Sequence, residues 1–320
     1  MERSQAKDAQ DLYDNRAAEC DTSWHARFTT HFVELLDLRP GEQVLDLACG
    51  TGLLTFKASD AVGTSGSVVG IDISTGMLAE ARTKLERRDL ENVQLYQHSI
   101  TDLTSLSELH SRAFDVISCA SALVLLPDPE EALKQWTQYL KPGGRLITDA
   151  THPRTFLPGI VLERVGGGLD VTVPSYREAF QRPKDLADIL RAVGLVDIEI
   201  KRMSQLSSRD GSDELQGFIS DAHKPLIAKE YAVSDAAAVF DAQVASPFGA
   251  FFVDEPIRSQ AKKLFEEEWA ELADEDGLLT EADEVFVGIG WKPAKRGNDL
   301  CTIDRCSLAH LSHDSAESAV

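Results

Sequence analysis

Short apolar runs alternate with helix-like segments over the first two thirds of the chain. Runs rich in β-branched residues predict strands at Val44–Leu47, Val68–Ile73, Val93–Gln97, Phe114–Cys119, Arg145–Thr148 and Val196–Ile200. Segments between them predict helices at Leu53–Val62, Gly76–Arg88, Pro129–Leu140 and Pro183–Val193. Because strand–helix alternation is typical of parallel pairing, the pattern predicts an α/β fold, a parallel sheet with helices on both faces.

The alternation stops after residue 203. Between 204 and 280 we expect helices only, among them Asp235–Val244 behind a Ser234 cap and a helix that starts near Pro256. The apolar run Glu284–Trp291 then predicts one more strand. The predicted domains are an N-terminal helical cap (1–40), a Rossmann-like domain (41–203 and 283–294), a helical insertion (204–282) and a polar, flexible tail (295–320).

Charge and composition narrow the function classes. The chain carries 32 Lys and Arg against 53 Asp and Glu, a net charge of −21, which disfavours nucleic acid and anionic membranes as partners. It shows neither a secretory signal nor an apolar run long enough to span a bilayer, and its five cysteines include no CxxC pair. We therefore expect a cytoplasmic protein with free thiols. The histidines form no compact ligand set, so we predict no metal.

The strongest chemical signal is a strand that runs into a glycine turn and then a helix, Val44–Gly52. Gly50 and Gly52 lack the Cβ atoms that would keep a ligand from the backbone, and Asp46 offers a carboxylate to a cationic group. Asp72 ends the next strand, at the spacing where an acidic side chain accepts hydrogen bonds from both ribose hydroxyls. Together these residues predict a ligand that contains an adenosine-like sugar.

Two cofactors meet that description, a nicotinamide dinucleotide and S-adenosylmethionine. A dinucleotide site usually has a third glycine, and here that position is Thr55. A pyrophosphate also needs no anion such as Asp46 close by, whereas the amino group and sulfonium of S-adenosylmethionine tolerate one. The residues favour S-adenosylmethionine.

Further segments strengthen this interpretation. The run Asp46–Gly52 resembles the first motif of class I S-adenosylmethionine-dependent methyltransferases. Four more segments are similar to the subgroup related to ubiquinone and menaquinone biosynthesis: Tyr13–Ala17, Phe114–Cys119, Leu126–Pro129 and Leu140–Leu146. The resemblance implies a Rossmann-like seven-stranded sheet whose last strand is antiparallel. It also implies methyl transfer to a small molecule, of the secondary-metabolite or quinone-like kind.

The same resemblance implies which residues contact the cofactor. They are Tyr13, Asp46, Ala48, Gly50, Gly52, Asp72, Ile73, Met77, Ser99, Ile100 and Cys119. The sequence departs from the family pattern in two places. The first is the adenine contact, where the family often has Gly-Asp and this chain has His98-Ser99; Asp102 is the alternative to Ser99 for that contact. The other is the large insertion, read either as a substrate lid or as a homodimer interface or stability element.

Candidate bases are few. His152 follows the fifth strand and His25 lies in the N-terminal segment, and each is read either as a catalytic base or as a structural histidine. A base is needed only when the acceptor is a poorly acidic O–H, N–H or C–H group. Several aromatic residues have two interpretations, as the lining of an apolar acceptor pocket or as the insertion's own core. They are Phe156, Tyr176, Phe180, Phe248, Phe251 and Phe252. An alternative function is a protein of this fold that binds S-adenosylmethionine as an accessory subunit or for another reaction.

Overall fold

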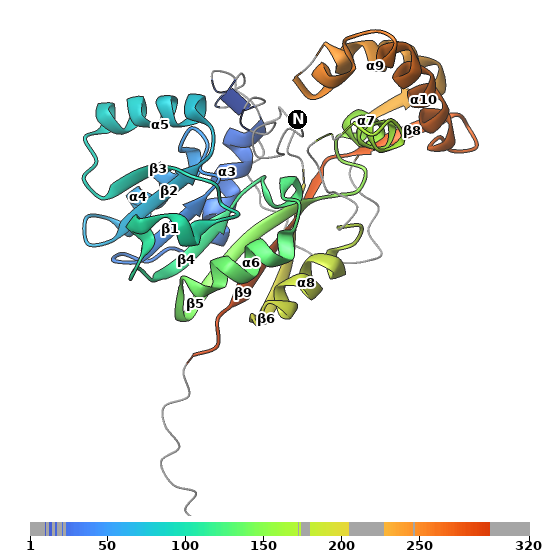
Figure 1. Ribbon diagram of the computed structural model, residues 1–320. Helices are drawn as coiled ribbons and strands as arrows, with labels where there is room; N and C mark the ends of the chain where they lie inside the picture. The colour runs from blue at the N-terminus through green and yellow to red at the C-terminus, as the bar shows by residue number, and fades with distance from the viewer. Residues whose placement is uncertain are drawn as a thin grey trace, which may run out of the picture.

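The computed structural model describes residues 24–171, 180–204, 227–245 and 247–294, together with residues 10, 13, 14, 17, 21 and 173. Its main body is a seven-stranded sheet in the order β3-β2-β1-β4-β5-β9-β6. These strands are β1 (Gln43–Leu47), β2 (Ser67–Asp72), β3 (Val93–Gln97), β4 (Phe114–Cys119), β5 (Leu140–Thr151), β6 (Val196–Ser204) and β9 (Glu284–Trp291). Neighbours among β1 to β5 pair in parallel, whereas β9 is antiparallel to both β5 and β6. The predicted sheet, with its antiparallel last strand, is confirmed (Figure 1).

Helices cover both faces of this sheet because successive strand residues point to opposite sides. Val44 packs on the face that holds Phe28 and Phe32, while Leu45 packs on the face that holds Trp136. The covering helices are α3 (Trp24–Leu35) and α4 (Leu53–Val62) on the first face, α6 (Pro129–Gln138) and α8 (Pro183–Ala192) on the second, and α5 (Thr75–Arg88) beside β2 and β3. Single 3-10 turns lie at η1 (Leu103–Ser105), η2 (Ser107–Leu109) and η3 (Leu123–Leu125). Within the described residues, every helix is too short or too polar to span a bilayer.

A second group of elements, which we call the small unit, lies beside the end of the sheet where β5 finishes and β9 begins (Figure 1). It consists of α7 (Leu157–Gly168), β7 (Ile227–Ala232), η5 (Val233–Asp235), α9 (Ala236–Val244), η6 (Pro247–Phe252), α10 (Ile257–Glu271) and β8 (Leu278–Ala282). The sequence predicted helices only between 204 and 280. That expectation is wrong, since β7 and β8 form an antiparallel pair.

The small unit has an apolar core of its own. Val161 on α7 packs in the same cluster as Phe240 on α9 and Phe265 and Trp269 on α10. The rings of Phe265 and Trp269 stack with centroids 5.4 Å apart. The core therefore includes α7, which precedes residue 204 and which the predicted insertion left out.

Two chain segments that connect the small unit to the sheet run together, and we call residues 152–157 and 280–284 the paired linkers. Arg154 Nε donates to the carbonyl of Thr280 at 2.9 Å, and the Ala282 N–H donates to the carbonyl of Arg154 at 2.9 Å. Thr155 Oγ1 donates to the carbonyl of Glu284 at 2.8 Å. These bonds fix the position of the small unit against the end of the sheet.

Candidate active site

The glycine turn after β1 is built from left-handed backbone conformations. Gly50 has φ +55° and Gly52 has φ +83°, a region that favours glycine. A Cβ on Gly52 would also come within 2.5 Å of the Phe56 ring, so this glycine allows α4 to start close to the turn. Gly50 directs its N–H at Asp72, where a 2.8 Å hydrogen bond ties the turn to the end of β2.

Asp72 is held by backbone donors from two sides. One carboxylate oxygen accepts from the Gly50 N–H, and the other accepts from the Ser74 N–H at 2.8 Å. Ser74 in turn caps α5 by accepting from the Met77 N–H. The side chain is 7% exposed, and this burial raises the pKa of Asp72. The carboxylate is thus fixed in place, with further lone pairs available to a ligand.

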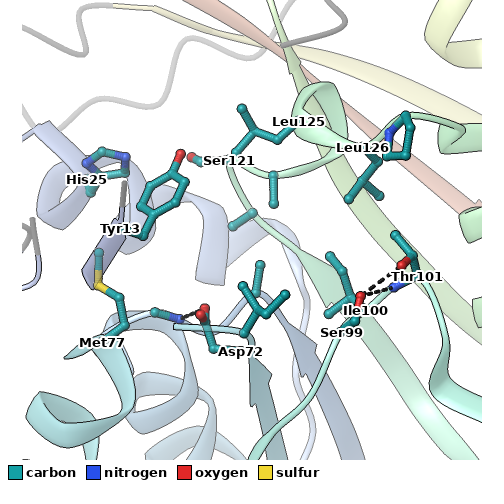
Figure 2. A pocket seen from close by; sticks show the side chains of 16 residues that line it. Tyr13, His25, Asp72, Met77, Ser99, Ile100, Thr101, Ser121, Leu125 and Leu126 are labelled. Atoms are coloured by element: carbon teal, nitrogen blue, oxygen red, sulfur yellow. Dashed lines mark hydrogen bonds between the residues drawn. The ribbon is translucent and has the colours of Figure 1, made fainter. Parts of the chain in front are cut away.

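A cavity of about 370 Å³ opens over this carboxylate, within the size range of small-molecule sites (Figure 2). The predicted residues that line it are Tyr13, His25, Ala48, Gly50, Asp72, Ile73, Met77, Ser99 and Ile100. The prediction missed Thr101, Ala120, Ser121, Ala122, Leu125, Leu126 and Pro127. Most of these missed residues follow β4, and the rule that ligands bind at the carboxyl ends of parallel strands could have found them.

A smaller cavity of about 70 Å³ adjoins the first, between α3 and the glycine turn, and Asp46 lies in its wall. Thr55 Oγ1 donates to one oxygen of Asp46 at 2.6 Å, and Ser118 Oγ donates to the other at 3.0 Å. Burial raises the pKa of Asp46 to about 7, despite these hydroxyl donors, and the nearby Asp72 adds to the rise. Thr55, which replaces the third glycine of a dinucleotide site, here orients the buried acid.

Two aspartates in the described part of the N-terminal segment attach it to the glycine turn and to α5. Asp14 accepts from Ser74 Oγ at 2.5 Å and from the Gly76 N–H at 2.8 Å. Asp21 accepts from Thr51 Oγ1 at 2.6 Å and forms an ion pair with Lys84 on α5. These contacts hold Tyr13 and His25 against the two cavities, where Tyr13 lines the larger one and His25 lines both.

Two predicted cofactor residues do not line either cavity. Gly52 caps α4 and packs against Phe56. Cys119 is fully buried at the end of β4, and this burial raises the pKa of its thiol. Both residues shape the backbone around the cavities without presenting a side chain to them.

His152 lies away from the cavities as well. The chain turns at this residue into the paired linkers, so the side chain packs at 5.7 Å between centroids against Phe286 of β9. Its Nδ1 accepts the Arg154 N–H at 3.0 Å. Burial, together with the positive charges of Arg202 and Arg154, lowers the pKa of His152 to about 4. Of the two interpretations of His152, these contacts favour the structural histidine over the catalytic base.

Ser99 and Asp102, the two residues considered for the adenine contact, differ in their position relative to the larger cavity. Ser99 lines the cavity, and its hydroxyl is 2.8 Å from Thr101 Oγ1. Asp102 lies outside the lining and accepts from Thr104 Oγ1 at 2.9 Å.

None of the described aromatic residues that were considered for an acceptor pocket lines either cavity. Phe180 is buried in the sheet core, Phe252 is buried in the small unit, and Phe251 packs against that same core. Phe156 is 38% exposed at the start of α7. Tyr176 and the side chain of Phe248 lie outside the described residues.

Residues 38–163 match a family model described as a methyltransferase domain. The chain is also 29% identical over 208 residues to the demethylmenaquinone methyltransferase of Bacillus cereus, covering 60% of this chain and 85% of that protein. The chain is a class I S-adenosylmethionine-dependent methyltransferase. Solved structures that share the fold of this methyltransferase include the following two.

The first is phosphoethanolamine N-methyltransferase 2 of Haemonchus contortus in complex with phosphomonomethylethanolamine and S-adenosylhomocysteine. It has a TM-score of 0.54 at 14% identity and covers 91% of this methyltransferase and 61% of its own chain. The second is a cyclopropane-fatty-acyl-phospholipid synthase-like protein of Lactobacillus casei. Its TM-score is 0.52 at 18% identity, with 83% of this chain and 90% of its own covered.

Proposed function

We propose that this methyltransferase acts on an uncharged, largely apolar small molecule of the quinol or phenol kind. The observation that carries this proposal is the stretch of cavity lining that follows β4, which we call the apolar wall; it contains Ala120, Ala122, Leu125, Leu126 and Pro127, with Ser121 as its one polar residue. Among the described residues that line either cavity there is no Lys or Arg. A buried anionic acceptor would need such a partner, whereas a neutral ring needs only apolar contact. The name of the Bacillus cereus relative, a demethylmenaquinone methyltransferase, agrees with this class.

The cavity residues fit S-adenosylmethionine. Asp72, fixed by the Gly50 and Ser74 N–H groups, would accept hydrogen bonds from the ribose hydroxyls. Ile73, Met77, Ser99 and Ile100 would enclose the adenine. The methionine end would lie in the smaller cavity beside Asp46, where Ala48 and Gly50 leave room for it and Tyr13 closes the larger cavity nearby.

When bound, S-adenosylmethionine supplies a methyl group whose carbon–sulfur bond breaks, leaving its electron pair on sulfur, as the acceptor's lone pair forms the new bond. The protein's part is to orient the acceptor and to exclude water, and alignment of this kind can contribute roughly 7–11 kcal/mol. His25 lines both cavities, so we propose it as the group that takes the acceptor's proton when the acceptor is a poorly acidic O–H.

The surroundings of the site complete the proposal. We take the small unit to be a substrate lid, because the paired linkers join it to the end of the sheet where β5 finishes. Its exposed apolar residues Val253 and Leu278 also make it the candidate surface for a homodimer.

The net charge of −21 argues for a small-molecule acceptor over nucleic acid, and we place the enzyme in the cytoplasm.

The test combines binding and transfer. Calorimetry should show S-adenosylhomocysteine binding and no binding of NAD. With methyl-labelled S-adenosylmethionine, label should pass to 1,4-naphthohydroquinone or catechol and not to phosphoethanolamine. Binding of NAD alone would overturn the cofactor assignment, and transfer to phosphoethanolamine alone would overturn the acceptor class.

A further inference from the structure

The two cavities share part of their lining. Residues common to both are His25, Ala48, Gly50, Ala120 and Ser121. The inference here rests on the proposed function, in which the ribose lies at Asp72 and the methionine end lies at Asp46. The sulfur atom joins those two parts of the cofactor, so it belongs at the junction that the shared residues define. Among these shared residues, His25 and Ser121 carry polar side chains.

Ser121 is held at this junction by a buried acid. It follows the end of β4 and has φ +57°, a conformation that a residue with a Cβ adopts only at some cost in energy. Its N–H donates to an oxygen of Asp149 at 2.6 Å. Asp149 is 2% exposed and lies on β5, inside the sheet. The strained turn is therefore anchored to the rigid part of the fold.

The Ser121 hydroxyl has no hydrogen-bond partner among the described residues, although its oxygen is buried. A buried hydroxyl left unpaired costs about 1–3 kcal/mol, which a ligand can offset by supplying the missing contact. Figure 2 shows Ser121, Tyr13 and His25 at one end of the larger cavity and Ser99, Ile100 and Thr101 at the other. The Ser121 side chain thus lies at the end of the cavity opposite the residues proposed for the adenine, and protein atoms cover its unpaired oxygen.

We propose that Ser121 Oγ, turned toward the cavity by rotation about the Cα–Cβ bond, contacts the sulfonium methyl group of bound S-adenosylmethionine, and that Asp149 is the positioning residue that holds the Ser121 backbone in place. The sulfonium charge spreads onto the methyl hydrogens, which attract an oxygen lone pair. A hydroxyl anchored from the sheet side can make this contact whichever acceptor occupies the apolar wall. Ser121 then favours cofactor that still carries the group to be transferred over the demethylated product.

A binding experiment tests this without knowledge of the acceptor. Sinefungin carries an ammonium-bearing carbon where S-adenosylmethionine carries its methylated sulfur, and S-adenosylhomocysteine has neither group. Calorimetry on the full chain should show that Ser121→Ala weakens sinefungin about tenfold, since a hydrogen bond to a charged donor is lost. The affinity for S-adenosylhomocysteine should stay within threefold. An unchanged ratio of the two affinities would overturn the assignment.

Ser121→Gly separates the hydroxyl from the strained backbone, because glycine adopts φ +57° without cost. It should lose sinefungin selectivity as Ser121→Ala does. His25→Ala removes the other polar side chain of the junction and should keep the selectivity. Loss of selectivity in His25→Ala but not in the Ser121 variants would overturn the proposal.

The role of Asp149 has its own pair of variants. Asp149→Asn keeps an oxygen that can accept the Ser121 N–H and should retain the wild-type selectivity within threefold. Asp149→Ala lacks that oxygen and should lose selectivity as Ser121→Ala does. If the Asn variant behaves like the Ala variant, the positioning role is overturned. If wild-type protein binds neither ligand, it is the proposed function that fails.

Discussion

The cofactor cavity and the small unit differ in where their residues come from. Apart from Tyr13 and His25, the residues that line the cavity fall between 48 and 127, and most lie at or just after the carboxyl ends of β1 to β4. The core of the small unit instead joins α7, at Leu157–Gly168, to elements that begin at Ile227 and end at Ala282. The cavity depends on backbone conformation and a few polar contacts, whereas the small unit depends on apolar packing. Substitutions in the two regions should therefore affect different properties.

The largest expected effect lies in the core of the small unit. Phe265 is fully buried, with its ring against Trp269 and Phe240. Phe265→Ala should lower the free energy of unfolding by about 3–5 kcal/mol, measured by urea denaturation. Leu278→Ala, at a 37% exposed position of the same unit, is the control and should cost far less. A tenfold loss of S-adenosylhomocysteine affinity in folded Phe265→Ala would show that the two regions are coupled.

The second effect tests the cofactor side. Asp72→Ala removes the carboxylate proposed for the ribose and leaves the Gly50 and Ser74 N–H groups without their acceptor. The affinity for S-adenosylhomocysteine, measured by calorimetry, should fall at least tenfold, or about 1.4 kcal/mol. Asp102→Ala removes an acid outside the cavity and should leave the affinity within threefold. A similar loss of affinity in both variants would support Asp102 as the residue that contacts the adenine.

The third effect concerns pH. Burial raises the pKa of Asp149 to about 7, well above its ordinary value. The folded protein therefore holds this proton more tightly than the unfolded chain does. The resulting stabilisation is complete below about pH 4 and is lost as the pH rises through 7. The free energy of unfolding should fall over this window, by on the order of 1 kcal/mol per pH unit for this group.

Asp149→Asn should flatten that fall in urea denaturation followed from pH 4 to 7. Asp46, whose pKa burial also raises to about 7, should leave a residual slope in this variant. The control is Glu108→Gln. Hydrogen bonds from the Glu108 backbone and the Ser107 side chain lower the pKa of this exposed carboxyl group. The effect of Glu108 on the free energy of unfolding therefore falls below the pH range of the experiment. If the free energy of unfolding of Asp149→Asn falls with pH as steeply as that of the wild type, Asp149 is not the group responsible.

The smallest effect concerns the paired linkers. Thr155→Val removes the hydroxyl that donates to the carbonyl of Glu284 and should lower the free energy of unfolding by about 0.5–1.5 kcal/mol. Thr83→Val is the matched control, since the Thr83 hydroxyl bonds the Ala79 carbonyl on the exposed side of α5. Equal effects in the two variants would mean that the linker bond adds nothing specific to stability.

The sequence predicted the strands and the glycine turn beside the larger cavity well because their signals are local. Runs such as Val93–Gln97 and Phe114–Cys119 have the observed strand bounds, and Asp72 ends β2 as its spacing indicated. Each of these features depends on a few consecutive residues. The glycine turn is likewise a backbone requirement that leaves a direct trace in the sequence.

The small unit was harder to predict because its contacts join distant segments. The apolar run Leu157–Val165 carries no mark that it packs against α9 and α10. The strands β7 and β8 depend on each other across more than forty residues, and neither stands out alone. His152 was considered as a catalytic base because it follows a parallel strand, although the structural interpretation was left open. Its neighbours β9 and Arg202, which come later in the chain, bury it elsewhere.

The position of β9 has a consequence for synthesis on the ribosome. β5 ends at residue 151, but the strand that pairs with its outer edge begins only at residue 284, about 130 residues later. At roughly 5–20 residues per second, that edge waits on the order of ten seconds for its partner. β6 is made during this interval and has no neighbour in the sheet until β9 is placed between it and β5. The nascent chain thus exposes an open strand edge that favours wrong pairing, and the described sheet is complete only when β9 has been translated.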